Sequence, residues 1–162
     1  MRRAVPLALL ATLLLACKGG DKDKAPAPPP SASGSQVEIT SSGITVHTDA
    51  GTFAVGGDAK VPDDFPKTVP IYPGAKPLLA GKTANGQGKP SWSVTLETPD
   101  EVTKIVAFYK SKLTSFTLAS DLAVGDSNMS VWQSPTYDVS AMVAAVPGDQ
   151  PSTSILLSVT AK

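Results

Sequence analysis

Cysteine, histidine and arginine are scarce in this 162-residue sequence, which has one cysteine, one histidine and no arginine after Arg3. A single cysteine cannot form an intrachain disulfide, and one histidine with one cysteine leaves too few ligands for a zinc site. Arginine makes most of the bidentate contacts between proteins and phosphate or guanine, so we expect no nucleic-acid partner. The segment Gly81-Lys82-Thr83 matches only the end of a phosphate loop, and we expect no cofactor.

The acidic residues form no catalytic or metal-binding pattern. Glu97 and Glu101 are candidates for the paired carboxylates of a glycoside hydrolase, but one ends a predicted strand and the other lies at the start of a predicted helix. Asp58, Asp63 and Asp64 lack the spacing of a calcium-binding loop. We therefore expect no catalytic residue and no metal ligand.

The N-terminal residues have the composition of a signal peptide. Arg2 and Arg3 precede an apolar stretch over residues 4–15, and the only cysteine of the chain follows at Cys17. A helix that spans a bilayer needs about 20 apolar residues, and Lys18 interrupts this stretch too early for that. The stretch therefore favours a cleaved signal over a spanning anchor.

The segment Leu14-Leu15-Ala16-Cys17 resembles the lipobox of bacterial lipoproteins. The resemblance implies that a signal peptide of residues 1–16 is removed and that acyl chains, palmitate among them, are attached to Cys17. Two or three acyl chains anchor a protein stably in a membrane. Lys18 after the cysteine favours the outer membrane of the cell envelope. The alternative is an ordinary secretory signal with a cysteine near its cleavage site.

Residues 17–36 are expected to form a disordered tether behind the lipidated cysteine. The segment is rich in Pro, Ser, Gly and Lys and has no large apolar residue, so it cannot bury enough surface to offset the entropy of ordering. Removal of the signal peptide with its two arginines leaves 12 basic against 14 acidic residues, a net charge of −2.

Residues 37–162 are long enough for one domain, in which we distinguish three parts. Alternating apolar residues separated by turns predict a β-meander over 37–57. Closely spaced prolines predict an ordered, extended connector over 58–77, and we expect its apolar residues Phe65, Val69, Ile71 and Tyr72 to lie across the body of the domain. The body over 78–162 contains a predicted helix over about 99–113, where Thr98 and Glu101 form a capping box. Candidate strands after the helix cover 116–122, 129–133, 137–146 and 153–161.

The connector contains Phe-Pro-Lys-Thr-Val-Pro-Ile-Tyr-Pro-Gly-Ala, which resembles a recurrent element of uncharacterised bacterial lipoproteins. The resemblance covers about residues 61–116 and implies a small α+β domain with no known activity. Those proteins often have a Gly-Trp pair after the helix, where this chain has Ser115-Phe116. Short turns between the predicted strands also favour an antiparallel sheet. We expect an α+β fold, a largely antiparallel sheet with one covering helix preceded by a short β-meander.

These features predict a membrane-anchored envelope lipoprotein that acts as a non-enzymatic binding or assembly module. An envelope protein or a glycan is the expected partner, in addition to the membrane bound through Cys17. Trp92, Trp132 and Tyr137 are candidates for an exposed aromatic surface, and the alternative is that they fill the core. Two other functions stay open: a carboxylate-dependent hydrolase of envelope polymers and a passive structural surface lipoprotein.

Overall fold

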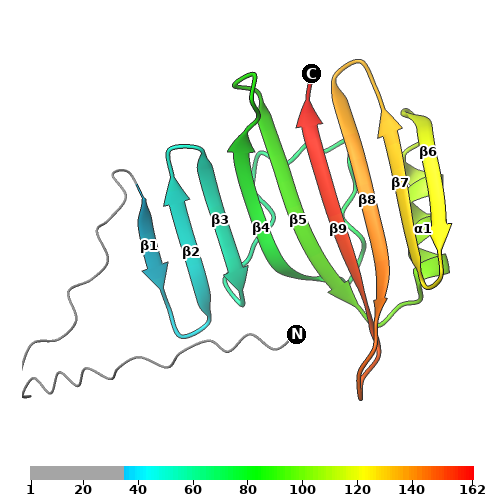
Figure 1. Ribbon diagram of the computed structural model, residues 1–162, viewed down its shortest axis with the longest axis horizontal. Coiled ribbons are helices and arrows are strands. Elements are labelled where there is room, and N and C mark those ends of the chain that lie inside the picture. Colours follow the sequence, from blue (N-terminus) through cyan, green and yellow to red (C-terminus); the bar gives the residue numbers. More distant parts are fainter. Residues whose placement is uncertain (1–34) are drawn as a thin grey trace, which may run out of the picture. The chain divides into compact units, whose positions relative to one another are not determined.

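The computed structural model describes residues 35–162 (Figure 1). The predicted signal peptide over 1–16, the predicted lipidation site Cys17 and the predicted tether up to residue 34 lie outside the described residues. Nine strands and one helix follow in chain order: β1 Gln36–Ile39, β2 Gly43–Thr48, β3 Gly51–Gly56, β4 Lys76–Ala84, β5 Pro90–Thr98, α1 Val102–Lys112, β6 Thr117–Val124, β7 Ser127–Gln133, β8 Tyr137–Val146 and β9 Ser152–Ala161.

All nine strands belong to one sheet, with the order β1-β2-β3-β4-β5-β9-β8-β7-β6, and every neighbouring pair is antiparallel. The β-meander extends this sheet, because β3 pairs directly with β4. The last strand of the chain, β9, lies inside the sheet between β5 and β8 (Figure 1).

The expected α+β class with a covering helix is wrong, and the fold is mostly β. Strands make up 54% of the structure and helix 9%. The 11 residues of α1 have a length of about 16 Å, enough to cover about three strands at 4.8 Å spacing. The helix packs mainly against β7 and β8, reaches β6 through the ion pair between Lys110 and Asp121, and lies behind the β6 end of the sheet in Figure 1. No helix in residues 35–162 is long and apolar enough to cross a membrane.

Alternation along the central strands divides the sheet into two faces. Trp92, Val94 and Leu96 of β5 are buried, and the residues between them are only half-buried. The strand register places these three beside the buried residues of β9 and β8, which include Ile155, Leu157, Val159, Val139 and Val143. We call the face of the sheet that carries these buried residues the covered face, and we call the opposite face the open face.

The proline connector completes the core on the covered face. Phe65, Val69 and Tyr72 of residues 57–75 are buried in the same cluster as the central strands. Turns hold the segment in place, with Phe65 N donating to Pro62 O at 2.9 Å and Val69 N donating to Pro66 O at 2.9 Å. The proline-rich segment, whose prolines have no backbone N–H group that needs a partner, therefore covers the central strands in place of the expected helix.

The helix begins later than expected, and the predicted capping box is wrong. Glu101 is the N-cap, and its side chain makes no capping hydrogen bond. Thr98 belongs to β5, where its side chain is buried and its hydroxyl oxygen accepts a hydrogen bond from Asp100 N at 3.3 Å. Ile105 and Tyr109 point from α1 into the core.

Candidate functional site

One row of side chains crosses the open face from the first strand of the sheet to the last. Its members are directly opposite one another in every neighbouring pair of strands. In spatial order the row consists of Ile39, Ile44, Val55, Leu79, Thr95, Leu156, Met142, Met129 and Leu122. We call these nine residues the apolar row.

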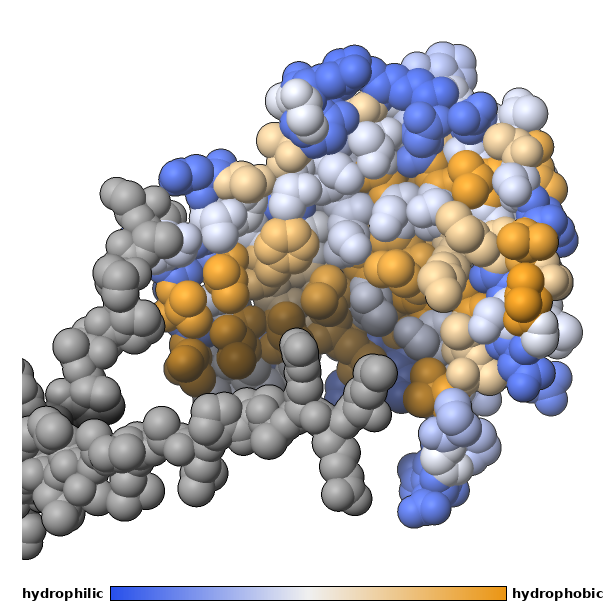
Figure 2. Space-filling view, in the orientation of Figure 1, coloured by the Kyte–Doolittle hydropathy of each residue, from blue (hydrophilic) through white to orange (hydrophobic). Residues whose placement is uncertain are grey.

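Large apolar side chains of this row are exposed to solvent. Seven of the nine are exposed, over a range from 37% for Leu156 to 76% for Ile39. Figure 2 looks onto the open face and shows hydrophobic residues over its middle and lower parts, with hydrophilic residues at the top. Exposed apolar residues scattered singly are common on proteins, whereas a contiguous apolar patch marks a surface that binds something.

A second row lies two residues further along each strand and carries smaller side chains in the centre of the sheet. It consists of Val37, Val46, Phe53, Gly81, Ser93, Ser158, Ser140, Val131 and Ser120. We call these residues the flanking row. A Cβ atom at Gly81 would overlap the ring of Phe53, so this ring lies over the glycine backbone. The apolar area is therefore two rows wide over β1 to β3.

The charged residues of the open face lie near the ends of the strands. Neither row contains a charged side chain. Glu97 is opposite Lys76 in the register and accepts a hydrogen bond from Ser152 Oγ at 2.7 Å. Asp138 forms an ion pair with Lys162, with 2.9 Å between Oδ1 and Nζ. The middle of the face is thus neutral, and its charges are confined to its borders.

The aromatic residues singled out in the sequence all lie on the covered face. Trp92 and Trp132 are 5% and 3% exposed, and Tyr137 is half-buried. The rings of Trp92 and Tyr137 meet edge to face, with 6.2 Å between their centroids. Trp92 also donates from Nε1 to Asp64 Oδ1 at 3.2 Å. The two tryptophans belong to the core and offer little surface to a partner.

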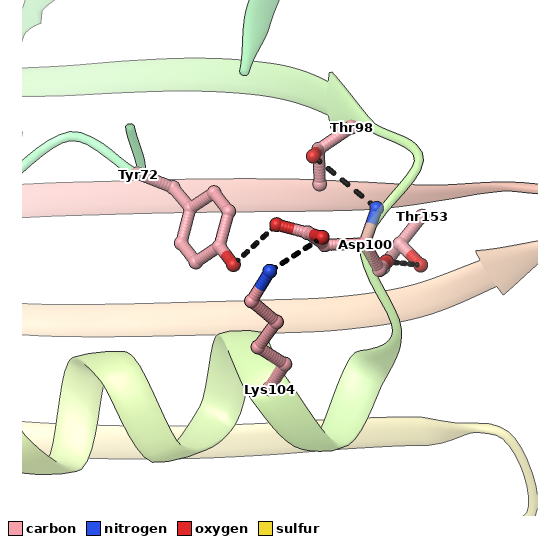
Figure 3. A network of polar contacts seen from close by, with 5 residues as sticks. All are labelled: Tyr72, Thr98, Asp100, Lys104 and Thr153. Carbon is pink, nitrogen blue, oxygen red and sulfur yellow. Dashed lines mark hydrogen bonds and ion pairs between the residues drawn. The ribbon is translucent and has the colours of Figure 1, made fainter. Parts of the chain in front are cut away.

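A network of polar contacts fixes the connector and the start of α1 to the sheet (Figure 3). Asp100 accepts hydrogen bonds from Tyr72 Oη at 2.7 Å and Lys104 Nζ at 2.7 Å, and its backbone carbonyl accepts from Thr153 Oγ1 at 2.6 Å. The bonds from Lys104 and Tyr72 lower the pKa of Asp100, while burial and the bond to Asp100 raise the pKa of Tyr72. Asp100 stays ionised with both carboxylate oxygens occupied, which is a structural role.

Two carboxylates near the meander and in the connector are engaged in the same way. Asp58 accepts from the hydroxyls of Thr40 and Ser42, and Asp64 pairs with Lys82. The buried polar side chains of residues 35–162 are Thr98, Asn128, Ser130 and Thr153, and none is acidic. Hydrolysis by paired carboxylates needs two acids in one cleft with opposed environments. Within residues 35–162, no three His, Cys, Asp or Glu side chains form a group that could hold a metal ion.

Cavities in the described part of the chain lie away from the two rows or only at their border. A cavity of about 690 Å³ lies beside β3, β4 and the start of the connector, where Lys60, Thr52, Ala54 and Ala80 contribute to its lining. Its volume is within the range of ligand pockets, but small side chains line most of it. A second cavity, of about 550 Å³, lies at the start of α1 beside the hairpin between β8 and β9.

Sequence reasoning missed the apolar row, although the strands contain a signal for it. Ile155-Leu156-Leu157 and Met142-Val143 place apolar residues at consecutive positions, and consecutive positions in a strand point to opposite faces. One face alone cannot bury both sets.

The open face is therefore the candidate functional surface of the described residues, formed by a neutral double row with exposed apolar side chains. No protein-family model, curated protein or solved structure matches the chain.

Proposed function

We propose that the chain is a lipid-anchored module of the bacterial cell envelope that binds or assembles with a partner through the open face of its sheet. The observation that carries this proposal is the apolar row across nine strands. Cys17 supplies the anchor, and the residues between it and β1 supply the tether. The proposed location is the outer membrane.

The energy available from the apolar row supports a binding role. Complete burial of an aliphatic side chain contributes about 1.5–3 kcal/mol, and these side chains have roughly half of that left to gain. The seven exposed members of the row offer on the order of 7 kcal/mol to a partner that covers them all. Association costs about 4–15 kcal/mol in lost freedom of motion, so complete coverage of the row offsets the lower part of this range.

Site-specific photocrosslinking in intact cells tests the proposal. A photoreactive amino acid replaces Leu156 in the full chain, and a second strain carries it at Leu118. The two leucines are similarly exposed, at 37% and 44%, but Leu118 is opposite Trp132 and belongs to the covered face. We expect a reproducible adduct with an envelope component, a further copy of the chain included, from position 156 and none from position 118. Equal adducts from both positions, or none from either, contradict the proposal.

The anchor is tested separately with labelled palmitate. We expect the label to enter the wild-type chain and to be absent from Cys17→Ser, because Cys17 is the only cysteine of the sequence and the first lipid is attached to its thiol. Equal labelling of the two chains contradicts lipidation at Cys17 without bearing on the open face.

A further inference from the structure

We infer that the partner of the open face is the open face of a second copy of the chain, so that two sheets pack face to face across a two-fold axis. This inference rests on the proposed function, since it names the partner of the same surface. Its basis is the shape, the charge and the area of the two rows.

The first argument is the complementary size of the two rows. A two-fold axis between the sheets, parallel to the rows and midway between them, turns the second copy over and places its apolar row on the flanking row of the first. In the three strands β5, β9 and β8 the flanking residues are serines, Ser93, Ser158 and Ser140, whereas the ring of Phe53 lies over Gly81 of β4. Leu156 and Met142 of the second copy thus project toward the lowest part of the face.

The second argument is the neutrality of the face. A two-fold axis brings each residue near the same residue or a close neighbour in the other copy, so a charged surface would face its own sign. The two rows contain no charge across nine strands. Lys76, Glu97 and Asp138 lie at the strand ends, where a rim open to water can hold them.

The third argument is the area. Nine strands at about 4.8 Å spacing span about 38 Å, and two rows with half a row on either side extend about 13 Å along the strands. The resulting strip of roughly 500 Å² on each copy buries roughly 1,000 Å² in total, which reaches the size that a specific interface needs. Two sheets of the same twist pack in an aligned arrangement, at about −30°, which brings such strips together.

The width of the apolar area favours a sheet over a narrower occupant. Val37, Val46 and Phe53 continue the apolar character into the flanking row over β1 to β3. An acyl chain or a single helix laid along the apolar row would leave these residues in water. A second sheet covers both rows at once.

The oligomeric state of the full chain, purified with its anchor in detergent, tests this inference. Sedimentation at micromolar concentrations compares the wild type with a variant that carries both Met129→Gln and Met142→Gln. These methionines are 49% and 48% exposed, and glutamine keeps their length while replacing the thioether with an amide. Leu118→Gln on the covered face is the matched control, and Leu156→Gln is a second variant of the row. Fluorescence of the buried Trp92 and Trp132 checks that each variant is folded.

We expect the wild type and Leu118→Gln to be dimers, and both row variants to raise the dimer dissociation constant at least about tenfold. Equal dissociation constants in all four chains overturn the inference, because the dimer would then use another surface. A wild type that is monomeric at every concentration also overturns it. If that monomer still gives the crosslink from position 156 to a different envelope component, the proposed function stands and only the second copy is refuted.

Discussion

Two tyrosines on the covered face, Tyr109 and Tyr72, should change the stability of the fold in opposite directions when each is replaced with phenylalanine. Tyr109 of α1 is fully buried, and its hydroxyl has no hydrogen-bond partner among the described residues. Burial raises the pKa of this tyrosine far above its usual value, and a weak contact with the backbone of Tyr72 offsets only part of the rise. Tyr72 is also buried, but it donates a hydrogen bond to the Asp100 carboxylate.

Replacing each tyrosine with phenylalanine removes one hydroxyl and little volume. An unsatisfied buried polar group costs about 1–3 kcal/mol, so Tyr109→Phe should stabilise the protein by about 1 kcal/mol after the loss of some packing contacts. A hydrogen bond to a charged group contributes about 1.5–3 kcal/mol. Tyr72→Phe should therefore destabilise the protein by about 1–2 kcal/mol, since Lys104 still neutralises Asp100.

Urea unfolding followed by tryptophan fluorescence measures both changes. The slope of the unfolding free energy against urea should be the same in the wild type and the two variants, so the midpoint reports stability directly. A midpoint for Tyr109→Phe clearly below that of the wild type would refute the reasoning. That result would mean that the hydroxyl has a partner, such as a buried water, whose loss costs more than the desolvation it relieves.

Two further predictions concern the edge strand β6 and the open face. Hydrogen bonds lower the pKa of Asp121 to about 2 from its usual 3.8, and the bond from Lys110 has the largest effect. Because the folded pKa is the lower one, this carboxylate stabilises the fold above pH 4, and the contribution is lost as pH falls from about 4 to about 2. Stability measured over this range should fall less steeply in Asp121→Asn than in the wild type, and equal slopes would contradict the assignment. Gly81→Ala should destabilise the fold by about 1–3 kcal/mol, because the new methyl group overlaps the Phe53 ring. In a Phe53→Ala background the same change should cost less, with the part that remains due to the Thr52 carbonyl oxygen at 2.8 Å, and an undiminished cost in this double-mutant cycle would show that the ring is not the obstacle.

Strand positions were accessible from the sequence because alternation and turn residues are local signals. The three strands of the meander occur where alternation predicted them, and β8 covers the predicted residues 137–146. The helix start was misjudged because Thr98 and Glu101 fit a capping pattern, whereas the side chain of Thr98 is buried at the end of β5. Local spacing cannot show that a hydroxyl is already used in the core.

The fold class required information that the sequence pattern does not contain. One helix and an antiparallel sheet suit an α+β fold as well as a mostly β fold, and the difference depends on how many strands the helix covers. The prolines of residues 57–75 excluded a helix there, and the prediction that the apolar residues of this segment pack on the body of the domain is confirmed, but the pattern did not show that the segment and the helix share the covering of the sheet. The apolar row is likewise a property of register, since it joins residues from nine separate strands.

The central position of β9 has a consequence for biosynthesis. Before residues 152–161 are made, β1 to β5 and β6 to β8 are two separate ribbons with no strand pairing between them, because β9 is the only strand among the described residues that pairs with both. The sheet becomes continuous only when β9 is made, however early the ribbons form. A ribosome that stops before residue 152 therefore releases a chain without a continuous sheet.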